Sequence, residues 1–169
     1  MFAIGDYVVY GTSGVYLIED CRIMDFDRIS IKDRKEYFIL KPLRENISLA
    51  YVPLDAAEQR LRPVTDKEIL LSSMEALKGK KIRWVDDRKR RNQIFRTILS
   101  EKNSGKMMTL LSCLYRKQSQ LHADGKKLSF ADSDVITQAE GCVGSEIAFT
   151  LSIPYNDAVT MLREALKPE

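Results

Sequence analysis

The stretch Lys78-Gly79-Lys80-Lys81-Ile82-Arg83-Trp84-Val85-Asp86-Asp87-Arg88-Lys89-Arg90-Arg91 divides the chain into two structural classes. The sequence before it has the pattern of short strands, and the sequence after it has the pattern of helices. It holds the only Trp of the chain, and nine Lys/Arg lie between Lys78 and Arg96 against two Asp, a local charge of +7 in a chain of net charge +3. A lone aromatic ring among cations is typical of a nucleic-acid contact. The alternative is a linker and a solvated helix whose Trp packs into a core.

The composition is that of an ordinary soluble globular protein. The chain has 169 residues, 44% of them hydrophobic and 30% charged, which allows one domain or two small ones. No apolar run approaches the ~20 residues that span a membrane, and the N-terminus lacks the pattern of a signal peptide. The three cysteines, Cys21, Cys113 and Cys142, are widely spaced. This spacing favours reduced thiols and a cytoplasmic protein.

The residues that usually carry catalysis or bind metal are sparse. His122 is the only His, and the cysteines form no CxxC pair, whereas a structural zinc site needs about four Cys or His ligands. The sequence also lacks a Gly-rich phosphate loop and a nucleophile elbow. We therefore expect no metal, no cofactor and no enzymatic activity.

The first 64 residues predict a small antiparallel β-barrel. Short β-branched and aromatic runs alternate with Gly and Pro turns at close spacing, which is the pattern of such barrels. Asp55–Glu58 interrupts this rhythm and predicts one helical turn. The expected strands cover residues 6–10, 15–24, 34–41, 47–52 and 62–64.

Residues 65–169 predict an all-α bundle of about five helices. Thr65 with Glu68 forms a capping-box pattern for a helix that ends near Leu77. Ser129 is the expected N-cap of the fourth helix, and Gly141 and Gly144 inside that helix would let another helix approach closely. The remaining helices are expected near 85–102, 107–121 and from 153 onward.

A helical projection of residues 85–102 separates Trp84 from the apolar stripe of that helix. The stripe stops at Ile94, and the earlier positions on the same face are Arg91 and Arg88. On a helix extended back to Trp84, Arg88 and Arg91 would share the face of the ring, whereas Lys89 and Arg90 would point elsewhere. The projection weakens the core interpretation of Trp84.

Several blocks of the sequence resemble the CarD/CdnL family of bacterial transcription regulators. The resemblance covers nearly the whole chain, and the barrel blocks carry it most specifically. It rests on residues 2–10, Gly14-Val15, 35–41, 52–58 and 61–64, on Trp84 with its basic run, and on Leu128-Ser129, Ala139, Glu146 and Ala148.

The resemblance implies an α+β protein in two parts. Residues 1–64 would be a Tudor/SH3-like barrel, shared with transcription-repair coupling factors, that docks on the RNA polymerase β subunit. Residues 65–169 would be a compact helical domain that contacts promoter DNA, in the minor groove near the −10 element. Trp84 would act as a wedge at the upstream edge of the bubble, stabilising the open complex. The protein would be monomeric, cytoplasmic and nucleoid-associated through the polymerase, with no membrane role.

The expected DNA contacts follow from the family position of Trp84 and the projection of its basic run. Trp84 would supply the ring, and Arg83, Arg88 and Arg91 would be the first phosphate contacts, before Lys89 and Arg90. The start of the helix adds free N–H groups that favour phosphate, although Asp86 and Asp87 would repel it.

The expected polymerase contacts depart from the family pattern. Met24 and Tyr51 occupy two positions where well-known members carry basic residues, and neither is charged. Arg22, Arg28 and Arg44 lie nearby as substitutes. The leading hypothesis is thus a polymerase-bound regulator of initiation. The alternative is a protein-interaction module, binding polymerase or another partner, without a direct DNA role.

Overall fold

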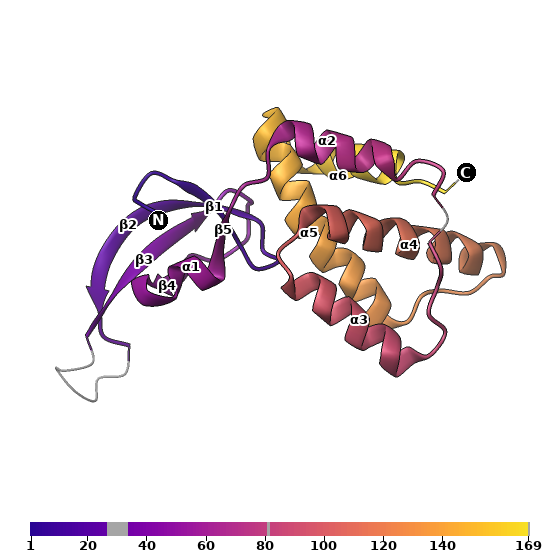
Figure 1. Ribbon diagram of the computed structural model, residues 1–169, viewed down its shortest axis with the longest axis horizontal. Coiled ribbons are helices and arrows are strands. Elements are labelled where there is room, and N and C mark those ends of the chain that lie inside the picture. Colours follow the sequence, from indigo (N-terminus) through magenta and orange to yellow (C-terminus); the bar gives the residue numbers. More distant parts are fainter. Residues whose placement is uncertain (27–33, 81, 169) are drawn as a thin grey trace. The chain divides into compact units, whose positions relative to one another are not determined.

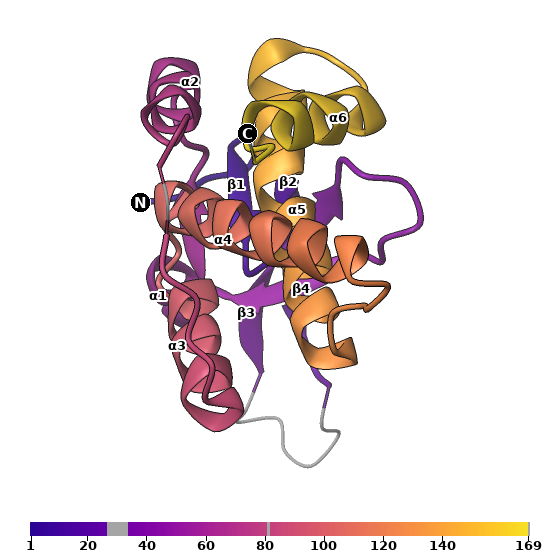
Figure 2. The same cartoon turned by 90° about the vertical axis from the view of Figure 1, so that its right-hand side faces the viewer.

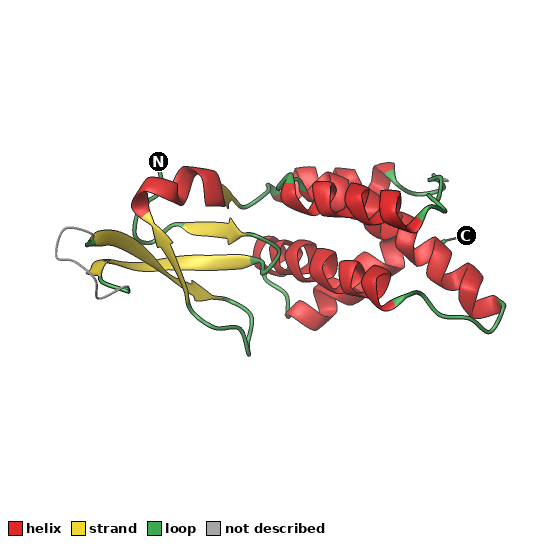
Figure 3. Ribbon diagram, turned by 90° about the horizontal axis from the view of Figure 1, so that it is seen from below, coloured by secondary structure: helices red, strands yellow, loops and turns green. Residues whose placement is uncertain are grey.

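The computed structural model describes residues 1–26, 34–80 and 82–168, and it divides the chain into two compact units, Met1–Val64 and Thr65–Glu169 (Figure 1). All five strands belong to the first unit, and the five long helices belong to the second (Figure 3). This arrangement confirms the expected α+β class, an antiparallel β part followed by an all-α part. In the described ranges, no helix is long and apolar enough to cross a membrane.

The first unit is a five-stranded antiparallel sheet in the order β4-β3-β2-β1-β5. Gly11 (φ 55°) and Gly14 (φ 101°) make the turn between β1 and β2, because both adopt a left-handed backbone that other residues rarely take. The shift in the β2–β3 register between Ile18 and Asp20 marks a bulge in the long hairpin. The strands are β1 Tyr7–Tyr10, β2 Val15–Met24, β3 Lys35–Pro42, β4 Ala50–Pro53 and β5 Leu61–Pro63.

A short helical crossover closes the core of the sheet. The 3-10 helix η2 (Leu54–Ala56) and α1 (Ala57–Arg60) lead from β4 to β5, as the interrupted strand rhythm predicted. Ala57 and Leu61 are buried against the sheet. The core consists of Val8, Tyr16, Ile18, Phe38, Leu40, Val52, Ala57 and Leu61.

The second unit is organised around α5, which packs against each of the other four long helices (Figure 2). This central position explains why residues 139–147 of α5 are all buried. The helices are α2 Lys67–Ala76, α3 Arg88–Ser100, α4 Ser104–Ala123, α5 Phe130–Leu151 and α6 Tyr155–Ala165.

The helix starts confirm one expected cap, correct the other and move the start of one helix. Ser129 caps α5 as predicted, because its hydroxyl accepts the Asp132 N–H at 3.2 Å. Thr65 does not cap α2, whose N-cap is Asp66. The Thr65 hydroxyl and N–H instead donate to the buried Glu146 carboxylate, at 3.3 and 3.4 Å. The second helix begins at Arg88 rather than near Val85, because Asp87 is its N-cap and accepts the Arg90 N–H at 2.9 Å.

Gly144 allows α6 to pack closely on α5. A Cβ atom at this position would lie 2.9 Å from Cγ2 of Val159 and 3.1 Å from the Tyr155 ring, closer than side chains tolerate. The expected role of Gly144 in a close helix approach is therefore confirmed.

We predict that Gly144→Ala destabilises the helical unit. The added methyl gains about 1 kcal/mol of helix propensity, but overpacking costs about 1–3 kcal/mol, so the free energy of unfolding should fall by about 1 kcal/mol in chemical denaturation. In a Val159→Ala background the same substitution should cost less, because the nearest clashing atom is gone. Equal costs in both backgrounds would contradict the close approach.

Candidate nucleic-acid interface

Trp84 lies in a non-helical segment before α3 and is half-buried. Its ring packs edge-to-face on the buried Phe95, with centroids 6.1 Å apart and planes at 64°. The predicted separation of Trp84 from the apolar stripe was therefore wrong, because the ring contacts Phe95 of that stripe from the non-helical segment before α3.

Two cations lie over the Trp84 ring. The guanidinium carbon of Arg91 is 4.6 Å from the ring centroid, and Nζ of Lys117 on α4 is 5.3 Å from it. Both distances are within the range of cation–π attraction, worth about 0.5–2 kcal/mol each. The ring is thus oriented by Phe95, Arg91 and Lys117 together.

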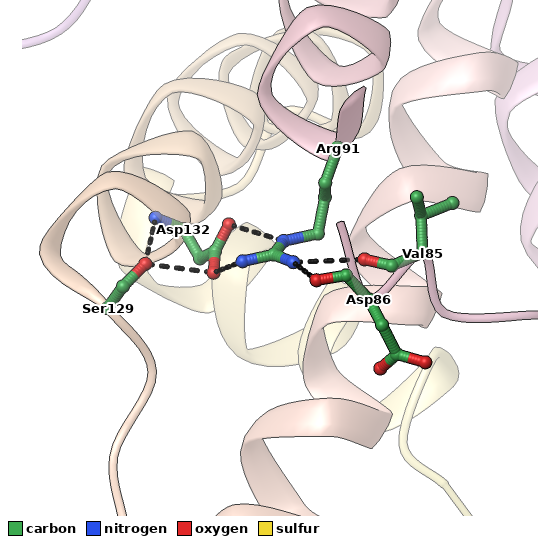
Figure 4. A network of polar contacts seen from close by, with 5 residues as sticks. All are labelled: Val85, Asp86, Arg91, Ser129 and Asp132. Carbon is green, nitrogen blue, oxygen red and sulfur yellow. Dashed lines mark hydrogen bonds and ion pairs between the residues drawn. The ribbon is translucent and has the colours of Figure 1, made fainter. Parts of the chain in front are cut away.

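Arg91 is buried, and Asp132 at the start of α5 neutralises its charge (Figure 4). Its Nε donates to Asp132 Oδ1 at 3.2 Å, and its Nη2 donates to Oδ2 at 3.0 Å. Ser129 Oγ donates to the same Oδ2 at 2.8 Å. This fork geometry is the strongest form of a charged pair, and the additional hydrogen bond satisfies the carboxylate further.

The same guanidinium holds the backbone that follows Trp84. Nη1 of Arg91 donates to the carbonyl of Val85 at 2.9 Å and to that of Asp86 at 3.1 Å (Figure 4). Arg91 therefore joins three parts of the unit: the segment before α3, α3 itself and the start of α5. A phosphate contact needs an accessible guanidinium, so this geometry makes Arg91 a positioning residue for Trp84.

The other four cations of the predicted DNA set are exposed. Arg83 precedes Trp84, whereas Arg88, Lys89 and Arg90 form the first turn of α3. Arg90 lines a groove of about 660 Å³ between α3 and α4, beside Ile94 and Ile98, so it lies on a different side of α3 from Arg91. The structure thus brings the cations to one end of α3 without directing all of them toward the ring.

Sequence reasoning missed Lys117 and Phe95 as neighbours of Trp84, and Asp132 as the partner of Arg91. The spacing of Ser129 and Asp132 indicates a helix cap and nothing more. Asp132 is 41 positions from Arg91. A local sequence pattern cannot predict that Arg91 and Asp132 form a pair.

Three of the predicted polymerase residues, Arg22, Met24 and Tyr51, lie on one face of the sheet. Arg22 pairs with Tyr37 in the β2–β3 register, and Tyr51 pairs with Ile39 in the β3–β4 register, opposite to the face of the core residues Phe38 and Val52. Arg22 is exposed and forms an ion pair with Asp20 at 2.6 Å. Met24 ends β2 and is half-buried, as is Arg44 after β3. Arg28 lies outside the described residues.

Three aromatic rings occupy this outer face. The ring of Phe26 makes edge-to-face contacts with Tyr37, at a centroid distance of 4.9 Å, and with Tyr51, at 5.5 Å. Phe26 is 53% exposed and Tyr51 is 39% exposed. The outer face of the sheet therefore presents an aromatic cluster of Phe26, Tyr37 and Tyr51.

The remaining buried polar groups bind one another. Glu140 on α5 accepts from the hydroxyl of Tyr115 on α4 at 2.6 Å and from two guanidinium nitrogens of Arg163 on α6 at 2.8 Å. Burial and the bond to Glu140 raise the pKa of Tyr115, and the bonds to Glu140 raise the pKa of Arg163. Glu146 is fully buried and accepts from Ser104 and Thr65. These groups connect helices.

The described residues offer little to metal or nucleophilic chemistry. Among them, no group of three or more His, Cys, Asp or Glu side chains is placed to hold a metal ion. Burial raises the pKa of the Cys21 and Cys113 thiols, which keeps both protonated near neutral pH.

We predict that Asp132→Asn lowers the free energy of unfolding by about 3 kcal/mol, because it leaves the buried charge of Arg91 without a counterion. The exposed Asp134 is the matched control, and Asp134→Asn should change stability by less than about 0.5 kcal/mol. Urea denaturation measures both. The double replacement Arg91→Met with Asp132→Leu should lower the free energy of unfolding less than Asp132→Asn alone, because it leaves no buried charge without a partner. A larger decrease would contradict this explanation.

Comparison with known proteins bears on the first unit. Residues 2–65 match the model of the CarD-like/TRCF RID domain. No curated protein matches the chain at a significant level. The matched residues cover the whole sheet, including the face with Arg22 and Tyr51. The N-terminal unit of this chain therefore matches the CarD-like/TRCF RID domain, a non-catalytic domain family that interacts with RNA polymerase.

Proposed function

We propose that this protein regulates transcription initiation by docking on the RNA polymerase β subunit and stabilising the open promoter complex. The N-terminal unit would dock, and the helical unit would contact DNA at the upstream edge of the −10 bubble. The observation that carries the proposal is the held ring of Trp84, half-buried among exposed cations, in a chain with a polymerase-interacting domain. The protein acts by binding alone, as a monomer, in the cytoplasm and on the nucleoid.

In the proposed DNA contact, the residues near Trp84 have different roles. The ring inserts at the junction from the minor-groove side, where duplex bases are already unstacking. Exposed Arg83 and Arg88 bind phosphates first, with Lys89 and Arg90 beside them. Arg91 sets the angle of the ring from inside the unit. A wedge held in this way loses little freedom on binding, which favours affinity.

The aromatic cluster of Phe26, Tyr37 and Tyr51 is the proposed centre of the polymerase contact. Aromatic side chains bury large areas at interfaces, and a few of them usually dominate the binding energy. Arg22, Met24 and Arg44 are the other proposed contacts of the described residues, and Arg28 stays in the proposed set although it lies outside them.

One observation favours the second candidate, an interaction module without a DNA role. Trp84 packs on Phe95 and carries two cations over its ring, so it also contributes to the fold of the helical unit. In that case Trp84 would matter for stability and not for the promoter.

Replacing Trp84 tests the DNA role. Trp84→Ala should shorten the half-life of the open complex formed with RNA polymerase by about tenfold, because stacking of an aromatic ring on a base is worth about 1–3 kcal/mol. Competitor-challenge assays measure that half-life. Trp84→Phe should keep part of the effect, and Arg96→Gln, which removes an exposed cation further along α3, should keep all of it. An unchanged half-life with Trp84→Ala, in a folded protein, would support the interaction module instead.

Replacing Tyr51 tests the polymerase contact. Tyr51→Ala should weaken binding to the polymerase β subunit by about tenfold or more, since central aromatic residues of interfaces cost about 2 kcal/mol or more when truncated. Ile23 is the matched control, because it is 65% exposed on the other face of β2. Titration calorimetry compares the two variants. If Ile23→Ala weakened binding as much as Tyr51→Ala, the proposed face would be wrong.

A further inference from the structure

Phe130 is a large apolar side chain left almost entirely in water. It is the first residue of α5 and is 89% exposed, against 53% for Ile69, another exposed hydrophobic residue of the helical unit. A single exposed hydrophobic residue needs no special explanation. Phe130 is a candidate contact residue because it lies beside the polar network that holds Trp84.

Phe130 and Trp84 adjoin opposite ends of the same polar network. Ser129, the residue before Phe130, donates to Asp132, which accepts from Arg91. Arg91 in turn donates to the carbonyl of Val85, the residue after Trp84 (Figure 4). Three consecutive contacts of 2.8–3.0 Å therefore connect the two backbones that carry the aromatic rings. Because Arg91 and Asp132 are buried, this connection is rigid.

The segments that carry the two rings are both basic. Exposed Lys126 and Lys127 precede Phe130, as exposed Arg83 precedes Trp84. Leaving out Arg91, whose charge Asp132 neutralises, residues 82–91 and 124–131 together hold six Lys/Arg and three Asp, a charge of +3 that equals the net charge of the whole chain. An exposed ring with cations on its approach suits a polyanion that also offers flat apolar faces, which is the chemistry of nucleic acid.

We propose that Phe130 is a second aromatic DNA contact, which stacks on an unpaired base of the same promoter junction that Trp84 enters. This inference rests on the proposed function of Trp84. The buried pair of Arg91 and Asp132 holds the two segments that carry the rings together, so that Trp84 opens the junction and Phe130 captures a base that has left the stack. Stacking needs no particular base, because every base has a flat face.

The first test compares open-complex half-lives with polymerase and the full-length protein. Phe130→Ala should shorten the half-life about fivefold or more, and Phe130→Leu should do nearly the same, because Leu keeps the apolar character but not the flat ring. Ile69→Ala is the matched control and should have no effect. Since Phe130 is 89% exposed, the thermal midpoint of Phe130→Ala should equal that of the parent protein.

The salt dependence of DNA binding distinguishes a stacking contact from a contact between a cation and a phosphate. Binding of the protein to a fork-junction promoter fragment should weaken with Phe130→Ala at every salt concentration, with an unchanged slope of log K against log[salt]. Arg88→Gln should reduce that slope by about 0.9, the value for one lost phosphate contact. A changed slope with Phe130→Ala would overturn a stacking role.

Crosslinking identifies what Phe130 contacts. With p-benzoylphenylalanine at position 130, irradiation of the open complex should attach the protein to promoter DNA. Adducts with polymerase polypeptides alone would overturn the inference and make Phe130 a protein contact. If Phe130→Ala leaves the half-life unchanged while Trp84→Ala shortens it, the inference fails and the proposed function survives. If neither substitution shortens it, the proposed function itself fails.

Discussion

The buried ion pair of Arg91 and Asp132 is the constraint on which the geometry of the helical unit's basic end depends. Burying two charges is costly, and such a pair is often no more stabilising than apolar residues of the same size. In this protein the ion pair orients the segment before α3 and the Trp84 ring. One guanidinium binds a carboxylate on α5 and two carbonyls of the segment before α3, and it lies over the Trp84 ring. That segment has no helical hydrogen bonds of its own, so Arg91 supplies what regular structure would otherwise provide.

The helix α5 shows why polar residues can be central to a bundle. Asp132, Glu140 and Glu146 are all buried on it, and each carboxylate binds a different set of neighbours. Asp132 reaches α3, Glu140 joins α4 to α6, and Glu146 binds Thr65 and the start of α4. Each of these three carboxylates is buried, so each charge needs a partner. The partners fix the rotation of α5 within the bundle.

Local patterns predicted the parts of this protein that local physics determines. The Gly11–Gly14 turn, the helical crossover at Asp55–Glu58, the Ser129 cap and the close approach at Gly144 all follow from residue chemistry within a few positions. The projection also placed Arg91 correctly on the apolar face of α3. It failed at Trp84, because α3 begins only after Asp87 and the ring contacts Phe95 from the non-helical segment before it. Arg91 and Asp132, or Thr65 and Glu146, are too far apart in the sequence for periodicity to pair them.

The two units present different physical chemistry to their proposed partners. The outer face of the sheet offers aromatic rings, whose binding depends on buried area and changes little with salt. The basic end of the helical unit offers cations around one held and one exposed ring, and the proposed phosphate contacts there would weaken as salt rises. The aromatic cluster would therefore hold the protein on the polymerase under conditions that release the proposed DNA contact. Such a regulator would respond to the promoter without leaving the polymerase, because the salt-sensitive contact would be the one at the bubble.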